Sequence, residues 1–274
     1  MENIKNLNEK SCEIRKSIVQ MLMEAGSGHL GGSLGLADIF TALYFQVLNH
    51  NPNNPRWEKR DRLVLSIGHV APLLYATLAH AGYFPIEELS TLRKLGSRLQ
   101  GHPALAHGIP GLETSSGSLG QGLSIGVGMA LAANQKKQNH KIYTIHGDGE
   151  MQEGAIWEAA MSAAHYKLNN LIAIVDKNGV QIDGRTSSVM NIDPLPEKFR
   201  AFGWEVIECE GNNMTDILAA FEKAKKTTLK PTAIVAHTSM GAGIEEIQGD
   251  YQWHGKAPSK EEAKRFIEKI CKNV

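Results

Sequence analysis

The sequence lacks an excess of either charge, a long hydrophobic run and a secretion signal. Among its 274 residues, 29 Lys and Arg balance 29 Asp and Glu, which argues against capture of nucleic acid or of an anionic membrane by charge. No apolar run approaches the roughly 18 residues of a membrane span. The N-terminus has neither the apolar core nor the small-residue cleavage site of a signal peptide, so we expect a cytoplasmic protein with no nucleic-acid or membrane partner.

Cysteine is also scarce. Three cysteines, an odd number without a CxxC pair, argue against a disulfide framework and against a structural zinc site. Glycine, in contrast, is abundant at 27 residues, and several of the 11 histidines adjoin a glycine. This composition indicates backbone-lined loops that carry chemistry.

Alternating strand-like and helix-like segments indicate an α/β fold. Five short apolar or β-branched runs predict buried strands, at residues 63–66, 142–145, 171–175, 204–207 and 232–236. Apolar residues at helical spacing predict helices at residues 14–22, 36–47, 120–138, 154–168 and 214–228, with a last helix that begins after Ser259. We therefore expect a three-layer fold, with a mostly parallel sheet and helices on both of its faces.

Nothing in the sequence divides the chain. It has no low-complexity linker and no repeat of fixed period, so we expect a single domain over residues 1–274. Four loops are longer than the usual ~4–6 residues, and such loops commonly carry function. They span residues 51–60, 101–118, 179–197 and 238–258.

Two polar residues follow neighbouring predicted strands. Asp148 lies between Gly147 and Gly149 after one strand, and Asn178 follows the next. If these strands pair in parallel, the two side chains converge at the edge where ligands bind in α/β sheets. Their oxygen atoms suit Mg²⁺, which usually shares its ligands with phosphates, so the pattern predicts a magnesium-diphosphate site. A plain turn after a strand is the alternative; a nucleotide-binding loop is disfavoured because no complete phosphate-loop or dinucleotide motif is present.

Together with Asn178, the Gly147-Asp148-Gly149 segment resembles the thiamine diphosphate fingerprint, and the surrounding sequence resembles transketolase. Further matches follow one another along the chain: Gly28-His29-Leu30-Gly31, Gly68-His69, Gly101-His102-Pro103, Gly117-Ser118-Leu119-Gly120, Gln152-Glu153-Gly154 and His254-Gly255. The sequence departs from the family at Leu30 and Ser118, which replace prolines, and at Lys177-Asn178-Gly179, which replaces a pair of asparagines. The two proline replacements are expected to affect loop rigidity rather than chemistry.

The resemblance implies the cofactor site. Thiamine diphosphate would bind with Mg²⁺, for which Ca²⁺ or Mn²⁺ could substitute, and the metal ligands would be Asp148, Asn178 and the backbone carbonyl of Val180. The diphosphate would contact Gly149 and His69. The thiazolium ring would lie against Gly117 and Leu119.

The resemblance also implies catalytic residues. His29, His102 and His254 would face the sugar and exchange hydroxyl protons, a role that suits imidazole near neutral pH. The resemblance implies Glu153 as a catalytic residue and Glu158 as a residue near the cofactor. Both glutamates would lie at a subunit interface and link two active sites. An exposed helix face is the alternative for these glutamates. His107 and His237 have no assigned role.

Compared with transketolase, the chain covers only the diphosphate-binding (PP-type) domain. The glutamate that acts on the aminopyrimidine, the pocket for that ring and the basic residues that hold a sugar phosphate would belong to another chain. The resemblance thus implies the N-terminal subunit of a split transketolase in the pentose phosphate pathway. Its partner would be a C-terminal subunit of about 300 residues, in an α₂β₂ heterotetramer.

The expected activity is transfer of a two-carbon ketol unit from a ketose phosphate to an aldose. One alternative is another thiamine-dependent carboligase, which forms deoxyxylulose phosphate or dihydroxyacetone. The other is a non-catalytic diphosphate-binding scaffold. His102 and His254, each beside a glycine, favour transketolase over another carboligase. The complete set of loop histidines argues against a non-catalytic scaffold. The donor sugar, phosphorylated or sulfonated, stays open.

Overall fold

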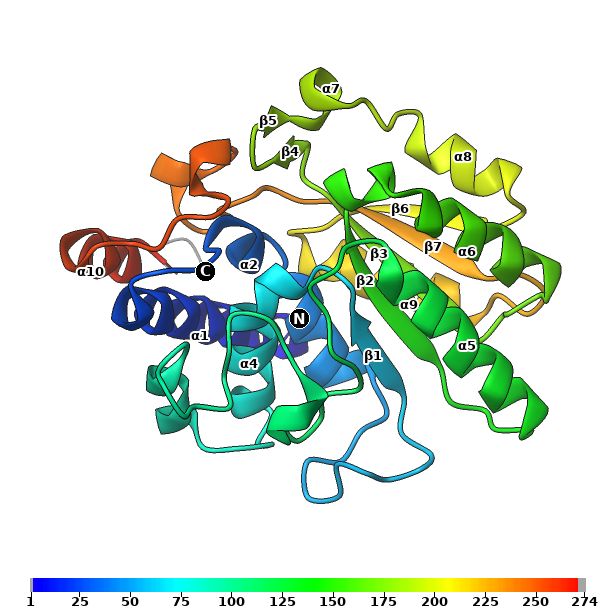
Figure 1. Cartoon of the computed structure of the whole chain (residues 1–274), viewed down its shortest axis with the longest axis horizontal. Coiled ribbons are helices and arrows are strands. Elements are labelled where there is room, and N and C mark those ends of the chain that lie inside the picture. Colours follow the sequence, from blue (N-terminus) through cyan, green and yellow to red (C-terminus); the bar gives the residue numbers. More distant parts are fainter. Residues whose placement is uncertain (1, 271–274) are drawn as a thin grey trace.

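A five-stranded parallel sheet forms the centre of the protein (Figure 1). The structure, a computed structural model, describes residues 2–270. The strands pair in the order β1-β2-β3-β7-β6, and every pairing is parallel. All five predicted strands are present, as β1 (Arg62–Leu65), β2 (Ile142–Gly147), β3 (Leu171–Lys177), β6 (Glu205–Glu210) and β7 (Thr232–His237). The predicted burial is wrong for β6, which lies at the edge of the sheet and is largely exposed or partly exposed.

Helices cover both faces of this sheet. Tyr143 and Ile145 point into one core and Ile142 into the other, as alternate residues of a strand must. The first core packs against α1 (Glu2–Ala25), α3 (Ala37–Ala42), α4 (Ala71–His80) and α9 (Met214–Lys225). The second packs against α5 (Gln121–Gln135), α6 (Gly154–His165) and α8 (Leu195–Ala201). The predicted three-layer arrangement is confirmed.

The N-terminal helices differ in detail from the prediction. The expected helix at 36–47 is divided into α3 and a π-helical turn, η1 (Leu43–Val47), and the preceding glycine-rich segment, predicted as a loop, contains α2 (Gly31–Gly35). Its glycines serve close packing: a Cβ on Gly31 would lie 2.6 Å from Met240 Cγ, and one on Gly35 would lie 3.1 Å from the Ser239 carbonyl oxygen. Helix α4 is not predicted by periodicity, because it is buried on nearly every side and shows no amphipathic pattern.

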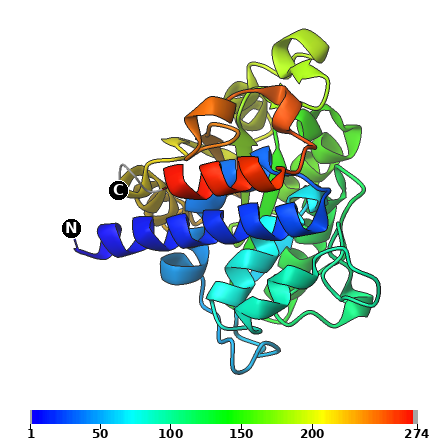
Figure 2. The ribbon, with the colours of Figure 1, turned by 90° about the vertical axis from the view of Figure 1, so that its left-hand side faces the viewer.

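The last described helix, α10 (Lys260–Lys269), runs beside α1 (Figure 2). Its predicted start is confirmed by a capping box, in which the Ser259 hydroxyl accepts from the Glu262 N–H and the Glu262 carboxylate accepts from the Ser259 N–H. Phe266 and Ile270 are buried as expected, and Ile267 packs at the edge of the core.

The long loops contain short elements of their own. The segment at 179–197 forms a hairpin, β4 (Val180–Gln181) with β5 (Gly184–Arg185), and then α7 (Thr186–Val189). The remaining turns are η2 (Gly68–Val70), η3 (Ile86–Thr91), η4 (Leu105–His107), η5 (Gly149–Gln152), η6 (Glu245–Ile247) and η7 (Tyr251–Trp253). No helix within residues 2–270 is long and apolar enough to cross a membrane. The cytoplasmic location and the single-domain assignment stay predictions.

Candidate functional site

The predicted functional residues gather at the carboxyl edge of the sheet, where loops follow parallel strands. His69 follows β1, Asp148 follows β2, Asn178 follows β3, and the loop after β7 carries His254. Strands β2 and β3 are direct neighbours, with Gly147 opposite Asp176. The expected convergence of the Asp148 and Asn178 segments is therefore confirmed.

Asp148 is held in place by backbone amides. One carboxylate oxygen accepts from the Gly149 N–H at 2.8 Å and the other from the Gly179 N–H at 2.6 Å. The second bond joins the loop after β2 to the loop after β3. Asp148 is only 2% exposed, so this carboxylate is fixed in position within the protein.

Asn178 reaches a second buried carboxylate. Its side-chain nitrogen donates to Asp176 at 2.9 Å, and its side-chain oxygen accepts from the Val180 N–H at 3.0 Å. Thr238 also donates a hydrogen bond to Asp176. Asp176 is not predicted from the sequence, because as the penultimate residue of a buried strand it has no distinguishing spacing.

The electrostatics of this pair fit a cation. Burial and the nearby Asp176 raise the pKa of Asp148 to about 7, and burial raises the pKa of Asp176 to about 6. Oxygen donors of this kind suit Mg²⁺. Within residues 2–270, no group of three or more His, Cys, Asp and Glu side chains could hold a metal.

Three of the predicted histidines form one cluster. The ring centroids of His29 and His69 are 5.0 Å apart, those of His69 and His254 are 5.1 Å apart, and those of His29 and His254 are 5.8 Å apart. The three side chains come from segments that are far apart in the sequence. The structure thus brings together residues that the sequence could associate only through the family resemblance.

Burial keeps these imidazoles neutral. Burial, together with repulsion from neighbouring cationic groups, lowers the pKa of His29 to about 4 and that of His69 to about 3. Burial also lowers the pKa of His254. The Nδ1 atoms of His29 and His254 are buried without a hydrogen-bond partner in the described part of the chain. Neutral rings with an unused polar atom can bind a ligand and accept or donate a proton.

His102 lies beside the glycine-rich loop predicted to face the thiazolium ring. A Cβ on Gly117 would come within 3.3 Å of the His102 ring, and one on Gly68 would lie 2.7 Å from the Gly117 nitrogen. The segments that carry His69, His102 and Gly117 are therefore in direct contact. Leu119 is partly buried against the core.

Glu150 is a buried residue that the sequence does not single out. Its carboxylate accepts from the Gly120 N–H at 2.7 Å and from the Ser66 hydroxyl, and it contacts His146 at 3.1 Å. These bonds connect the loop after β1, the loop before α5 and the end of β2. A buried carboxylate therefore holds the predicted cofactor loop in place through its bond to Gly120. Sequence patterns do not reveal this role, because a single glutamate after Gly-Asp-Gly has no distinguishing spacing.

The remaining predicted residues lie outside this centre. Glu153 and Glu158 are both exposed at the start of α6, and Glu153 lies next to Gly120. The interface role of this pair stays a prediction. His107 is exposed on η4, and His237 pairs with Glu208 at 3.2 Å on the surface.

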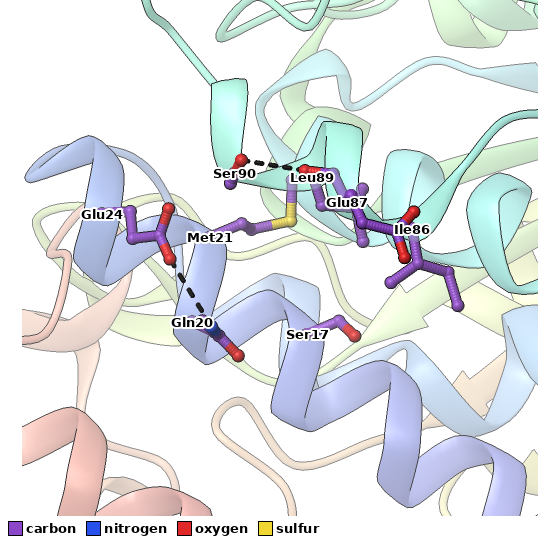
Figure 3. A pocket seen from close by; sticks show the side chains of 8 residues that line it. All are labelled: Ser17, Gln20, Met21, Glu24, Ile86, Glu87, Leu89 and Ser90. Carbon is purple, nitrogen blue, oxygen red and sulfur yellow. Dashed lines mark hydrogen bonds between the residues drawn. The ribbon is translucent and has the colours of Figure 1, made fainter.

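A pocket between α1 and η3 lies apart from this site (Figure 3). Ser17, Gln20 and Glu24 line it from α1, and η3 supplies the opposite wall. The Gln20 amide reaches Glu24 at 3.5 Å. The pocket contains none of the predicted functional residues, so the candidate site rests on the cluster at the sheet edge.

Comparison with known proteins gives consistent matches along the chain. The family described as "Transketolase, thiamine diphosphate binding domain" matches residues 8–273. The chain is 40% identical to one of the subunits of an apulose-4-phosphate transketolase from Phocaeicola vulgatus, over 99% of this chain and 96% of that protein. It is 43% identical to the 6-deoxy-6-sulfo-D-fructose transketolase subunit SqwG of a Clostridium species, over 97% of each.

A solved structure supports the same fold. The crystal structure of transketolase from Campylobacter jejuni superposes with a TM-score of 0.89 at 38% identity, over 96% of this chain. Only 42% of the Campylobacter chain is covered. The chain thus resembles one part of that longer enzyme and nearly the whole length of the two subunits.

Proposed function

Since the chain belongs to the family of transketolase thiamine diphosphate binding domains, we propose that it is the diphosphate-binding subunit of a two-chain transketolase. The observation that carries this proposal is the meeting, at one sheet edge, of the buried Asp148 carboxylate and the His29, His69 and His254 cluster. A diphosphate-metal site beside neutral imidazoles is what ketol transfer requires.

The cofactor-binding half of the site belongs to this chain. Asp148, Asn178 and the Val180 carbonyl would hold Mg²⁺, while Gly149 and His69 would contact the diphosphate. Gly117 and Leu119 would line the thiazolium ring, and the bonds that Glu150 makes would keep that loop in place. When bound, thiamine diphosphate supplies the carbanion that attacks a ketose carbonyl.

The histidines would handle the protons of the sugar. His29 and His254 are neutral near pH 7, because burial lowers the pKa of both imidazoles. They can therefore accept a proton from a sugar hydroxyl and return it. His102, whose ring lies beside Gly117, would share this task.

A second chain would complete the site. Two relatives that the chain matches over nearly their full length are named as subunits, which supports a partner that carries the pyrimidine-binding half. Glu153 and Glu158, exposed at the start of α6, would lie at the interface with that partner. An α₂β₂ assembly would place two such sites in one molecule.

The substrate class is an anionic ketose donor and an aldose acceptor. One relative is named for a sugar phosphate and another for a sulfosugar, so the donor could be phosphorylated, as in the pentose phosphate pathway, or sulfonated. Another thiamine-dependent carboligation is the alternative activity. It would use the same cofactor residues and differ in the acceptor.

The proposal is tested with Asp148→Asn and, as a matched control, Asp183→Asn on the nearby exposed turn. Thiamine diphosphate binding with Mg²⁺ is measured by titration calorimetry on the complex with its partner, and two-carbon transfer by product analysis. Asp148→Asn should weaken binding by more than roughly 100-fold, since even outer partners of metal ligands contribute 10- to 100-fold, and should abolish transfer. Unchanged cofactor affinity in Asp148→Asn would refute the metal assignment. Products other than a transferred two-carbon unit would favour the alternative carboligase.

A further inference from the structure

Arg93 occupies a backbone position that normally belongs to glycine. Leu92 has φ −47° and ψ 127°, Arg93 has φ 59°, and the Lys94 N–H donates to the Thr91 carbonyl at 3.0 Å. These values describe a type II turn with Arg93 at its third position, where a positive φ favours glycine. Arg93 therefore carries a long side chain at a position whose backbone conformation is unfavourable for most residues other than glycine.

Two other non-glycine residues among residues 2–270 have a positive φ, and both have an ordinary explanation. Lys137 and Lys167 lie just beyond the ends of α5 and α6, and both are exposed. Residues at helix ends commonly adopt this conformation. Arg93 differs because its side chain is half-buried and makes specific contacts. Strain of this kind points to a role for the side chain.

The guanidinium connects two loops that carry predicted catalytic histidines. Its Nη1 donates to the Ser27 hydroxyl at 2.8 Å, two residues before His29. Its opposite edge packs on Gly101, where a Cβ would come within 2.6 Å of Arg93 Nε. Gly101 directly precedes His102, so only glycine lets the guanidinium lie this close to the His102 loop.

The charge of Arg93 acts on the same two histidines. The charged or titratable groups that face His29 are His69, His102, His254 and Arg93; Arg93 also faces His102. After burial, Arg93 contributes to the lowered pKa of both His29 and His102. It is not among the causes for His69 or His254, whose pKa values are lowered by burial and, for His69, by the other histidines.

We propose that Arg93 is a positioning residue that spans the loops of His29 and His102 and places one fixed positive charge beside both rings. Its link to catalysis rests on the proposed function, because it assumes that these histidines exchange protons with the sugar. The effect of the Arg93 charge on the His29 and His102 rings does not depend on the proposed function. The Ser27 bond, the Gly101 contact and the turn geometry carry the inference together.

Two substitutions test the proposal. Arg93→Gly suits the turn and removes the side chain, whereas Arg93→Lys keeps the charge without the planar fork. Histidine ring signals are followed by NMR against pH in the full-length chain. Arg93→Gly should raise the pKa of His29 and His102 and leave that of His254 unchanged, while Arg93→Lys should keep both pKa values low. An equal change at His254, or no change at His29 and His102, would overturn the charge assignment.

The positioning role is tested on the complex with its partner. Arg93→Gly should lower kcat/KM roughly 10- to 100-fold, as expected when reacting groups shift by about 1 Å, without lowering the thermal midpoint. Arg93→Lys should restore part of the activity. Full activity in Arg93→Gly, or a loss that only follows reduced stability, would overturn the positioning role. If no ketol transfer is found in the unmodified complex, the proposed function fails, and the NMR result still decides the effect of Arg93 on the rings.

Discussion

At the scale of single residues, burial makes the histidine cluster sensitive to acid. The His69 ring packs against the rings of both His29 and His254, and its pKa is lowered to about 3 by burial and by repulsion from His254, His29 and His102. A ring in this setting stays neutral at pH 7, which is required if it contacts a cofactor rather than repelling a metal ion. The same setting makes protonation unfavourable for the folded chain.

This effect predicts a pH dependence of stability. Because the unfolded chain binds the His69 proton near pH 6.5 and the folded chain only near pH 3, the unfolded state holds more protons between these values. The contribution of His69 to the free energy of unfolding should therefore fall as pH drops through this window, whereas the raised pKa values of Asp148 and Asp176 act in the opposite direction. His69 alone should contribute a loss of about 2 kcal/mol between pH 7 and pH 5, measured by urea unfolding.

A variant isolates this contribution. His69→Asn removes the titrating ring, so its free energy of unfolding at pH 5, relative to that at pH 7, should be higher than in the unmodified chain by about 2 kcal/mol. Identical slopes for His69→Asn and the unmodified chain would show that His69 is not held neutral by burial.

Only part of the site could be predicted from individual residues. Asp148 and Asn178 could be found because each follows a recognisable strand, and chain direction alone brings strand ends to one edge. Glu150 and Arg93 could not, since their roles depend on contacts with Ser66, Ser27 and other residues distant in sequence. Sequence patterns indicate periodicity and chain direction, whereas these contacts depend on tertiary packing.

At the scale of elements, glycines within α5 have different roles. A Cβ on Gly126 would lie 3.3 Å from Leu171 Cδ1 and closer still to Thr144 Cγ2, because the helix rests directly on the sheet there. A Cβ on Gly128 would meet no heavy atom within 4 Å. Both glycines lie in the middle of the same helix. Substituting each in turn therefore distinguishes the effect of packing against the sheet from the effect of helix propensity.

Opposite effects on stability are expected from alanine at these two positions. Gly126→Ala should destabilise the chain by roughly 1–3 kcal/mol because of overpacking. Gly128→Ala should stabilise it by roughly 0.5–1 kcal/mol because alanine favours the helix. Urea unfolding of both variants measures the difference. A Gly126→Ala variant as stable as Gly128→Ala would mean that α5 can move away from the sheet at little cost.

Elements differ in how well the sequence predicts them. Strands β1, β2, β3 and β7 are predictable because they are short, mostly apolar and largely buried. Helix α10 is predictable because it has a capping residue and one apolar face. Helix α4 is not, because burial removes its polar face. Segment 31–35 resembles a loop in sequence because its glycines are equally consistent with flexibility and with the close packing that they provide.

At the scale of the whole molecule, exposed residues flank the buried centre of the site. His102 and both glutamates at the start of α6 are exposed, and the chain matches only 42% of a solved transketolase. In contrast, it covers nearly all of two proteins named as subunits. These proportions support a site completed by a second chain.

Native mass spectrometry of the chain purified from its own cells tests this arrangement. We expect a stoichiometric complex with a second polypeptide of about 300 residues, in a symmetric assembly, and ketol transfer by the complex but not by this chain alone. Glu158→Lys on α6 should reduce the fraction of complex, whereas Glu222→Lys, exposed on α9 across the sheet, should not. A homo-oligomer that transfers ketol units unaided would contradict the two-chain proposal. An inactive homo-oligomer that still binds thiamine diphosphate would instead support a non-catalytic scaffold, because cofactor binding would then occur without ketol transfer.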